Sequence, residues 1–351
     1  MWFDTLLAYH LIPDLFVRIG LWMHFTRRRT QDPFGIETRS AKMRKYLSML
    51  RQQPIALSTD KANEQHYEVP TEFFDIVLGP RKKYSCCWFP KLRLSKKNLV
   101  DQLPKAEEKM LEITAARASI DDGDRVLDVG CGWGSFSLFA AERFPNSKIT
   151  AISNSATQKQ YIDRIAREKH LKNINVITAN IVDFEFDERD ERFDRIVSIE
   201  MFEHMRNYEK LMQKMADFLT HDGTLFIHIF ARVGMPYLMK VKKTSGFISK
   251  YFFTGGMMPS EDLLLHFQQD LALQDMWRIN GMHYYRTLMA WLKKMRMNKN
   301  KVKKLFQDAY GKGEGTKWYN YWKIFFISCA EMFRYALGNR WFIAHYLFKK
   351  R

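Results

Sequence analysis

The sequence predicts an α/β protein with one mostly parallel, seven-stranded sheet and additional helices before and after it. The first observation is the stretch 125–138, where a short apolar strand pattern leads into three closely spaced glycines and then an apolar helical pattern. The second is the alternation of strand and helix patterns that continues to residue 230. Such alternation with short loops is typical of a parallel sheet with helices on both faces.

The region before this core is expected to be helical. Apolar residues recur every four positions from Phe3 to Met23, and Pro13 is expected to begin a second helix. Charged side chains interrupt the run, so it lacks the composition of a membrane-spanning segment, and it also lacks a secretory signal pattern. Further predicted helices are a basic one at 38–52, a pair at 61–78 hinged at Pro70, and one strongest at 106–118.

From residue 125 onward, short apolar runs predict strands and longer amphipathic runs predict helices. The expected strands are 125–129, 148–152, 175–178, 193–199, 223–230, 273–279 and 341–348. The expected helices are 135–143, 156–169, 208–219, 287–310 and 318–337. We expect the last strand to be antiparallel. Ligands of such sheets bind at the carboxyl ends of the strands, which here carry 130–134, 153–154, 180–181, 200–204 and His228.

The glycine turn narrows the class of ligand. Gly130, Gly132 and Gly134 follow a strand directly, and they permit a tight turn, close approach of a ligand and close packing of a helix. Their spacing is G-x-G-x-G, whereas a dinucleotide site has G-x-G-x-x-G, and Asp128 stands inside the strand before them. This pattern indicates a Rossmann-like enzyme that uses S-adenosylmethionine (SAM). The alternative is a glycine-rich turn without a ligand.

The charge and the cysteines limit partners and location. A net charge of +17 is compatible with nucleic acid, an anionic membrane surface or an anionic ligand. Eight basic and no acidic residues lie in 286–304, where apolar residues alternate with them. This segment predicts either a helix at a membrane surface or an ordinary helix with a buried stripe. The four cysteines show neither CxxC nor zinc spacing, which indicates a reducing compartment and favours a cytoplasmic protein that is peripheral to a membrane at most.

Several longer motifs resemble one family. The segments are HYEVPTEFF, YSCCWF, LDVGCGWGSFS, SIEMFEHM, YFFTGG and AHYLFKK. Together they resemble the cyclopropane-fatty-acyl-phospholipid synthases and the related coclaurine N-methyltransferases, from about Lys61 to the C-terminus. YSCCWF, SIEMFEHM and the last segment are of the N-methyltransferase type. The resemblance implies a class I SAM-dependent methyltransferase domain at 106–351, with helical insertions at about 231–338, and a helical cap at 1–105.

The resemblance also implies which residues contact SAM. Tyr84 and Ser85 would close over the methionyl part, and Asp128 would orient the turn. The remaining implied contacts, from the strand ends, are Gly130, Gly132, Ser153, Asn154, Gln158, Asn180, Ile181 and Ile199. No acidic residue ends the second strand to bind the ribose. Asn180 replaces a common aspartate near the adenine, and its amide oxygen can still accept a hydrogen bond.

The catalytic candidates are Glu200, Glu203 and His204, which correspond to three residues of the coclaurine branch. Methyl transfer needs a neutral amine, but most amines are protonated at pH 7, so one carboxylate can bind the ammonium while a neighbouring base takes its proton. We expect Glu203 and His204 to handle the proton and Glu200 to bind the ammonium. The alternative is a helix-capping Glu203 and a core His204. Their spacing does not favour a metal site, and no metal is expected.

The expected function is SAM-dependent N-methylation of a small aromatic or alkaloid-like amine. The main alternative is lipid cyclopropanation, in which a bound bicarbonate would contact residues corresponding to Cys86, Glu203, His228 and Tyr284. Against it, Glu200 replaces the glycine usual in lipid-acting members, and Phe230 replaces a smaller aliphatic residue. If the acceptor is an amine, its pocket would be shaped by Cys86, His228, Phe230 and Tyr284.

A nucleic-acid methyltransferase is a remote alternative because no [D/N]-P-P-[Y/F/W] motif occurs. The oligomeric state is left open.

Overall fold

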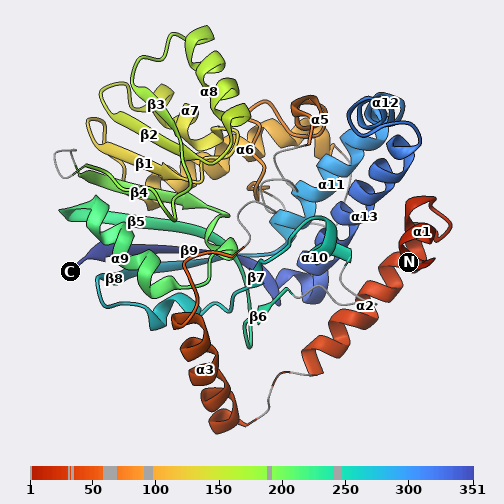
Figure 1. Ribbon diagram of the computed structural model, residues 1–351, viewed down its shortest axis with the longest axis horizontal. Coiled ribbons are helices and arrows are strands. Elements are labelled where there is room, and N and C mark those ends of the chain that lie inside the picture. Colours follow the sequence, from red (N-terminus) through yellow and green to blue (C-terminus); the bar gives the residue numbers. More distant parts are fainter. Residues whose placement is uncertain are drawn as a thin grey trace.

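The computed structural model describes residues 2–30, 32, 35–57, 69–90, 98–187, 192–239 and 247–351. A seven-stranded sheet lies at its centre, in the order β3-β2-β1-β4-β5-β9-β8 (Figure 1). The strands are β1 (Arg125–Val129), β2 (Lys148–Ser153), β3 (Ile174–Thr178), β4 (Phe193–Ile199), β5 (Leu219–Arg232), β8 (Leu271–Ile279) and β9 (Trp341–Lys350). The five strands from β3 to β5 are parallel, whereas β9 pairs antiparallel with both β5 and β8. The predicted fold class and the antiparallel last strand are confirmed.

Helices cover both faces of the sheet. Helices α6 (Leu99–Arg117) and α7 (Ser135–Arg143) pack on one face around Val126 and Phe226, and α9 (Tyr208–Phe218) packs on the other around Leu127 and Ile227. The alternation of side chains along each strand places these two apolar sets on opposite faces. Helix α8 (Ala156–Glu168) lies beside α7 over β2 and β3. The remaining short elements are η1 (Phe202–His204), β6 (Tyr237–Leu238), α10 (Phe247–Tyr251), β7 (Met257–Met258), η2 (Leu263–His266) and η3 (Tyr335–Gly338).

A second layer of helices stands beside the sheet, at the right of Figure 1. It contains α1 (Trp2–Ala8), α2 (Asp14–Thr30), α5 (Thr71–Val77), α11 (Met282–Met297), α12 (Lys299–Tyr310) and α13 (Glu314–Arg334), while α3 (Ile36–Arg51) packs beside α9. The most extensively buried of these is α11, in which Leu288, Met289, Trp291, Leu292 and Met295 lie inside the protein. The apolar stripe of the basic segment 286–304 is therefore an ordinary buried stripe, one of its two interpretations.

Some element boundaries differ from the prediction. The helix expected at 287–310 is two helices, because the backbone leaves the helical region at Asn298 and the Asn298 side-chain amide donates to the Lys294 carbonyl at 2.9 Å. Of the pair expected at 61–78, the second is α5, and the first lies outside the described residues. Helix α6 continues from Leu99 to Arg117 and therefore crosses residue 105, at which the predicted helical cap ends. The division of the chain at this residue stays a prediction.

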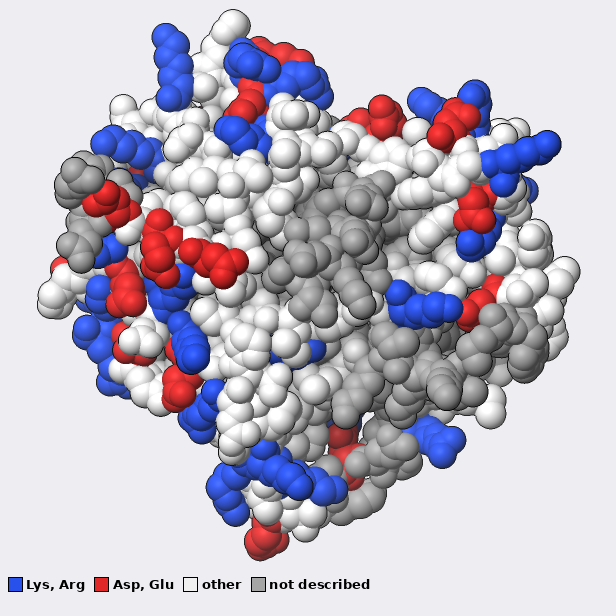
Figure 2. Space-filling view, viewed as in Figure 1, with Lys and Arg blue, Asp and Glu red and all other residues white. Residues whose placement is uncertain are grey.

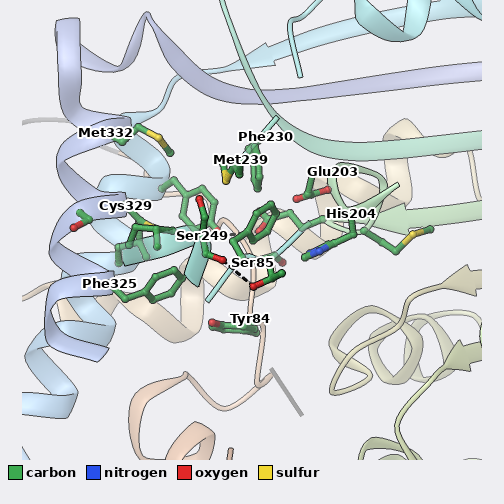
Figure 3. Close-up of a pocket in the computed structure, with 18 of the residues that line it drawn as sticks. Tyr84, Ser85, Glu203, His204, Phe230, Met239, Ser249, Phe325, Cys329 and Met332 are labelled. Atoms are coloured by element: carbon green, nitrogen blue, oxygen red, sulfur yellow. Dashed lines mark hydrogen bonds between the residues drawn. The ribbon is translucent and has the colours of Figure 1, made fainter. Parts of the chain in front are cut away.

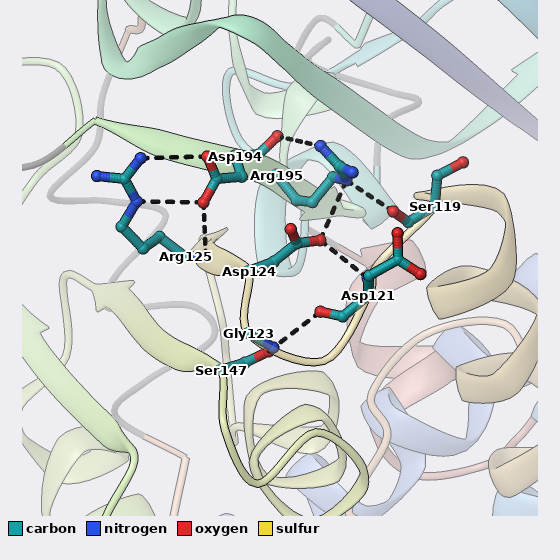
Figure 4. A network of polar contacts seen from close by, with 8 residues as sticks. All are labelled: Ser119, Asp121, Gly123, Asp124, Arg125, Ser147, Asp194 and Arg195. Atoms are coloured by element: carbon teal, nitrogen blue, oxygen red, sulfur yellow. Dashed lines mark hydrogen bonds and ion pairs between the residues drawn. The ribbon is translucent and has the colours of Figure 1, made fainter.

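A polar network fixes the end of the sheet opposite the glycine turn (Figure 4). The Arg125 guanidinium donates to both carboxylate oxygens of Asp194, at 3.1 and 3.2 Å, so it links the beginning of β1 to the beginning of β4. Arg195 pairs with Asp124 at 3.3 Å and donates to the Ser119 carbonyl at 2.7 Å. These contacts tie the loop after α6 to the sheet and hold β1 in register beneath the glycine turn.

In the described part of the chain, none of the helices combines the length and the apolar composition needed to cross a membrane.

Candidate active site

A cavity of about 1390 Å³ lies at the carboxyl ends of β1, β2 and β4 and extends to α2, α11 and α13. All the implied SAM contacts line it: Tyr84, Ser85, Asp128, Gly130, Gly132, Ser153, Asn154, Gln158, Asn180, Ile181 and Ile199. So do the three catalytic candidates and two of the four expected pocket residues: Glu200, Glu203, His204, Phe230 and Tyr284. Side chains that are up to 200 positions apart in the sequence therefore share one cavity, as expected for the carboxyl edge of a parallel sheet.

The glycine turn has three distinct roles in this cavity. All three glycines have positive φ, and a Cβ on Gly134 would lie 2.6 Å from Ile162 of α8, while one on Gly130 would lie 2.7 Å from Met201. A Cβ on Gly132 would instead meet no atom within 4 Å, because Gly132 faces the open cavity. Next to it, the buried Ser135 hydroxyl at the start of α7 has no hydrogen-bond partner among the described residues. An open backbone and an unpaired hydroxyl fit a polar ligand at this turn.

Asp128 and the residues after β2 form the polar side of this part of the cavity. The Ser137 hydroxyl donates to Asp128 at 2.5 Å, and burial raises the pKa of the Asp128 carboxyl to about 7. Beyond β2, the Ser153 hydroxyl donates to the Gln158 side-chain oxygen at 2.6 Å and orients both groups. Asn180 accepts from the Val182 N–H at 3.1 Å, which leaves its amide oxygen one lone pair for a ligand.

Lys83 is a cavity residue that the sequence analysis missed. Its side chain is 1% exposed, and its ammonium group donates to the Ser85 hydroxyl. Its positive charge counteracts the effect of burial on the pKa of both Asp128 and Glu200. The only sequence signal was a lysine directly before an apolar, aromatic segment, which is too common to indicate a buried cation.

Three groups lie within hydrogen-bond distance of the carboxylate of Glu200, which directly follows β4. The Cys86 N–H lies 2.9 Å and the His228 Nε2 3.3 Å from one carboxylate oxygen, and the Tyr284 hydroxyl donates to the other at 2.5 Å. The backbone of Glu200 has a φ of +50°, in a region that glycine adopts more readily, and its N–H donates to the His228 carbonyl at 2.7 Å. Burial raises the pKa of the Glu200 carboxyl, whereas Lys83, Tyr284 and the Cys86 N–H act in the opposite direction.

Glu203, in η1, is surrounded very differently. Its side chain is 1% exposed, and its Oε2 atom has no hydrogen-bond partner among the described residues. Burial raises the pKa of the Glu203 carboxyl well above its ordinary value, and the neighbouring Glu200 raises it further. The two carboxyls thus differ in proton affinity, and Glu203 is the stronger base.

The acceptor side of the cavity is largely apolar and aromatic. Figure 3 shows Glu203 and His204 on one side, facing Phe325, Cys329 and Met332 of α13 across the pocket. Phe230 and Met239 lie between these two sides, with Tyr84 and Ser85 below them in this view. The His204 ring contacts Phe253, with 4.5 Å between ring centroids. Sequence analysis missed most of these walls because they come from segments without a recognisable motif.

Cys86 and His228 do not line the cavity, although both were expected to shape the acceptor pocket. Both side chains are fully buried behind Glu200, which Cys86 contacts through its backbone N–H and His228 through its ring.

The comparisons with known proteins agree with this geometry. The family described as mycolic acid cyclopropane synthetase matches residues 57–341. The chain belongs to this family. It is 37% identical to the (S)-coclaurine N-methyltransferase of Thalictrum flavum subsp. glaucum over 86% of this chain and 82% of the relative. The corresponding (S)-coclaurine N-methyltransferase of Papaver somniferum is 32% identical over 97% and 95% of the two chains.

Solved structures are similar to most or all of the chain. A coclaurine N-methyltransferase bound to N-methylheliamine and SAH is 34% identical, has a TM-score of 0.93 and covers 99% of both chains. The cyclopropane synthase MmaA2 from Mycobacterium tuberculosis has a TM-score of 0.69 at 20% identity, over 83% of this chain and 98% of the other, and this likeness shows the fold alone. The protein is a SAM-dependent methyltransferase, and SAM is its co-substrate. The predicted family, enzyme class and cofactor are confirmed.

Proposed function

We propose that the protein methylates the amine nitrogen of a small aromatic, alkaloid-like molecule. The observation that carries this proposal is a pair of carboxyls at the edge of an apolar cavity: Glu203 is fully buried, and the Glu200 side chain is only 10% exposed. A buried negative charge is costly without a cationic partner, and a substrate ammonium would provide one. The relatives named above are coclaurine N-methyltransferases, which is consistent with this acceptor class.

In this proposal Glu203 takes the proton of the substrate ammonium. Its unpaired Oε2 can accept a hydrogen bond, and its raised pKa makes it a stronger base than an ordinary carboxylate. His204 follows it directly, lines the same cavity and assists the proton transfer. Once the proton has left, the nitrogen lone pair is free to attack.

Glu200 is proposed to bind and orient the ammonium group. Its three donors occupy both lone pairs of Oε1 and one of Oε2, which leaves one acceptor position on Oε2. Aromatic side chains such as Phe230 and Tyr284 supply ring faces that attract a cation at short range. We propose that Phe230 and Tyr284 contact the acceptor, while Cys86 and His228 act behind Glu200.

SAM, when bound, supplies an electrophilic methyl carbon on its sulfonium. We propose that Tyr84, Ser85 and the glycine turn hold its methionyl part, and that the residues after β2 and β3 hold the ribose and adenine. The proposed adenosine contacts are Ser153, Asn154, Gln158, Asn180, Ile181 and Ile199. These groups would align the amine with the methyl carbon inside a cavity that excludes water, and such alignment contributes much of the rate of a displacement.

Lipid cyclopropanation is the second candidate, and one contact argues against it. The Glu200 carboxylate accepts hydrogen bonds from Cys86, His228 and Tyr284, three of the four residues that would have to bind bicarbonate. A bicarbonate would therefore have to displace a carboxylate that is already held by three donors. The residues present do not fit a bound bicarbonate.

The experiment that separates the two functions uses SAM with a fully deuterated methyl group. The purified protein is incubated with aromatic secondary amines, coclaurine among them, and in parallel with unsaturated phospholipid vesicles. An amine product that retains three deuterons, detected by mass spectrometry, is the expected result. A lipid product that retains two deuterons would instead identify a cyclopropane synthase, because one deuteron is lost to a base.

We further propose a cytoplasmic location with, at most, peripheral contact with an anionic membrane. All four cysteines are free thiols, in keeping with a reducing compartment. Helix α2 exposes Leu15, Ile19, Trp22 and Met23, which supports α2 over the buried α11 as the membrane-facing helix. Binding to anionic phospholipid vesicles that is lost in Ile19→Glu would support this contact, and equal binding by both proteins would refute it.

Nucleic acid is not an expected partner. Among the described residues, Figure 2 shows basic and acidic side chains interspersed along the margin of one face, over α8, α12 and α3. An absence of salt-sensitive binding to DNA or RNA is the expected result.

A further inference from the structure

A chain of hydrogen bonds leads from the catalytic cavity through the sheet to α6. His228 Nε2 lies 3.3 Å from Glu200 Oε1, His345 Nε2 lies 2.8 Å from His228 Nδ1, and an Arg117 guanidinium nitrogen lies 2.9 Å from His345 Nδ1. We propose that Arg117 is a positioning residue that fixes the ring protons of His345 and His228, so that His228 donates a hydrogen bond to Glu200. The role in catalysis rests on the function proposed above, whereas the direction of the chain does not.

Strand register explains why these groups meet. His228 of β5 is paired with His345 of β9, which is paired in turn with Trp277 of β8. Directly paired residues of antiparallel strands point to the same face, so the three side chains form one row across the sheet. The Arg117 guanidinium, at the end of α6, lies 4.8 Å from the Trp277 ring centroid and reaches His345 from there. The last strand thus inserts His345 between the active site and a helix that precedes the glycine turn.

The Arg117 end determines the direction of the hydrogen bonds. A guanidinium has only donors, so Nδ1 of His345 must accept and carries no proton. A neutral His345 therefore has its proton on Nε2, which faces Nδ1 of His228. That nitrogen must then accept as well, so His228 carries its proton on Nε2 and donates to Glu200. Arg117 alone is sufficient to assign both tautomers, provided that both rings are neutral.

The Glu200 end independently requires the same direction. The Oε1 atom that faces His228 also accepts from the Cys86 N–H, and an oxygen of the ionised Glu200 carboxylate can only accept. His228 Nε2 must therefore be the donor of that pair. Two ends of the chain, about 80 positions apart in the sequence, demand one and the same pair of tautomers.

The surroundings keep both rings neutral. Both are fully buried, and burial together with the charges of Lys83 and Arg117 lowers the pKa of each imidazole well below its ordinary value. The other charged and titratable groups around the chain come from several elements: besides burial, Glu200 raises the pKa of Glu203 of η1, Cys86, Tyr284 of α11 and Cys329 of α13, and Asp275 of β8 acts on Arg117. The two neutral imidazoles thus lie between a cationic donor, Arg117, and a carboxylate acceptor, Glu200. Each group in this row donates its hydrogen bond in the direction of Glu200.

The direction of these hydrogen bonds excludes a role in proton transport and supports a role in positioning Glu200. Because Arg117 cannot accept a proton, the chain has no outlet there and does not carry the substrate proton to solvent. Its effect is to supply a donor to Oε1 of Glu200, which favours the carboxylate form and leaves the free lone pair of Oε2 toward the cavity. Arg117 would therefore influence the reaction without touching the substrate.

The direct test is NMR of the imidazole nitrogens in protein labelled with ¹⁵N-histidine, recorded without an acceptor. His228→Gln and His345→Gln variants assign the two rings. We expect both rings in the wild-type protein to be neutral and protonated on Nε2 throughout pH 6–8. In Arg117→Met we expect His345 to be no longer restricted to this one tautomer. Protonation on Nδ1 of either ring in the wild-type protein, or unchanged His345 signals in Arg117→Met, would overturn the proposal.

Kinetics test the consequence for Glu200. Loss of one aligned donor in Arg117→Met is expected to lower kcat/KM about three- to tenfold at neutral pH, and to move its acid limb to higher pH. Arg117→Lys keeps a donor and should restore both values toward wild type. Arg125→Met is the matched control, since it removes a half-buried arginine at the far end of the sheet and should leave the pH profile in place.

The outcomes distinguish the two proposals. If the tautomers are as expected but no amine is methylated, the proposed function fails while the direction of the chain stands. If amines are methylated and the pH profile of Arg117→Met equals that of wild type, the positioning role is overturned.

Discussion

The carboxyl groups of Glu200 and Glu203 lie three positions apart and have opposite hydrogen-bond environments. Glu200 accepts from three donors, whereas Oε2 of Glu203 accepts from none of the described residues. Burial raises the pKa of both carboxyls, but Lys83, Tyr284 and the Cys86 N–H counteract it at Glu200, whereas the charge of Glu200 raises the pKa of Glu203 further. Of the two carboxyls, Glu203 therefore binds a proton more strongly.

Replacement of Glu203 by Gln should abolish most of the activity without affecting cofactor binding. General-base catalysis typically contributes about 10²- to 10⁴-fold, so a loss of kcat of at least about 100-fold is expected. Calorimetric titration with SAH should give an unchanged Kd. Glu209→Gln is the control, because Glu209 lies on the outer surface of α9 and pairs with Arg51. Full turnover by Glu203→Gln would refute the role of Glu203 as the base.

The same variant should change how stability depends on pH. The pKa of Glu203 is raised in the folded protein, so the folded state binds more protons than the unfolded state and loses stability as pH rises through that pKa. The loss of stability is about 1.4 kcal/mol for each unit by which the pKa of Glu203 differs between the folded and unfolded states. A glutamine cannot ionise, so the variant does not lose this stability. Urea unfolding from pH 5 to 8 should show Glu203→Gln becoming progressively more stable than wild type. A difference that stays constant with pH would contradict the raised pKa.

Alanine substitutions at two glycines of the turn should have different effects, one mainly on stability and the other mainly on cofactor affinity. Gly134→Ala places a Cβ 2.6 Å from Ile162 at a φ of +72°, so a lower Tm is expected. Gly132→Ala also has a positive φ, but its Cβ points into the open cavity. We expect its main effect to be weaker SAH binding, about tenfold or more in Kd, with the smaller change in Tm. Equal SAH affinity in Gly132→Ala and wild type would show that the cofactor does not approach this backbone.

The network at the far end of the sheet should matter for stability alone. Asp194→Asn removes the charge that two Arg125 nitrogens contact, and a loss of about 1–2 kcal/mol is expected for charge-assisted hydrogen bonds in a partly buried site. Arg125 lowers the pKa of Asp194, so this stability is present above the ordinary carboxyl range and is lost as pH falls through the lowered pKa. Urea unfolding should show a smaller difference between Asp194→Asn and wild type at pH 3 than at pH 7. A changed KM for SAM would contradict a purely structural role.

Sequence patterns were sufficient for the fold, and the family resemblance indicated residues that line one part of the cavity. Gly130, Gly132 and Asp128 are local signals, because a strand, a tight turn and a helix are encoded within 14 consecutive residues. The carboxyl edge of a parallel sheet then brings together residues such as Ser153 and Asn180. The domain division and the roles of individual residues stay predictions.

Only the tertiary structure decided how the two carboxyls differ and what lies behind them. Glu200 and Glu203 are chemically identical in the sequence, and their difference depends on donors from distant segments such as Cys86 and Tyr284. The buried Lys83 and the chain from Arg117 through His345 have no motif, because their contacts join residues up to 228 positions apart. Local patterns specify backbone shape, whereas proton affinity depends on burial and on partners that folding alone brings together.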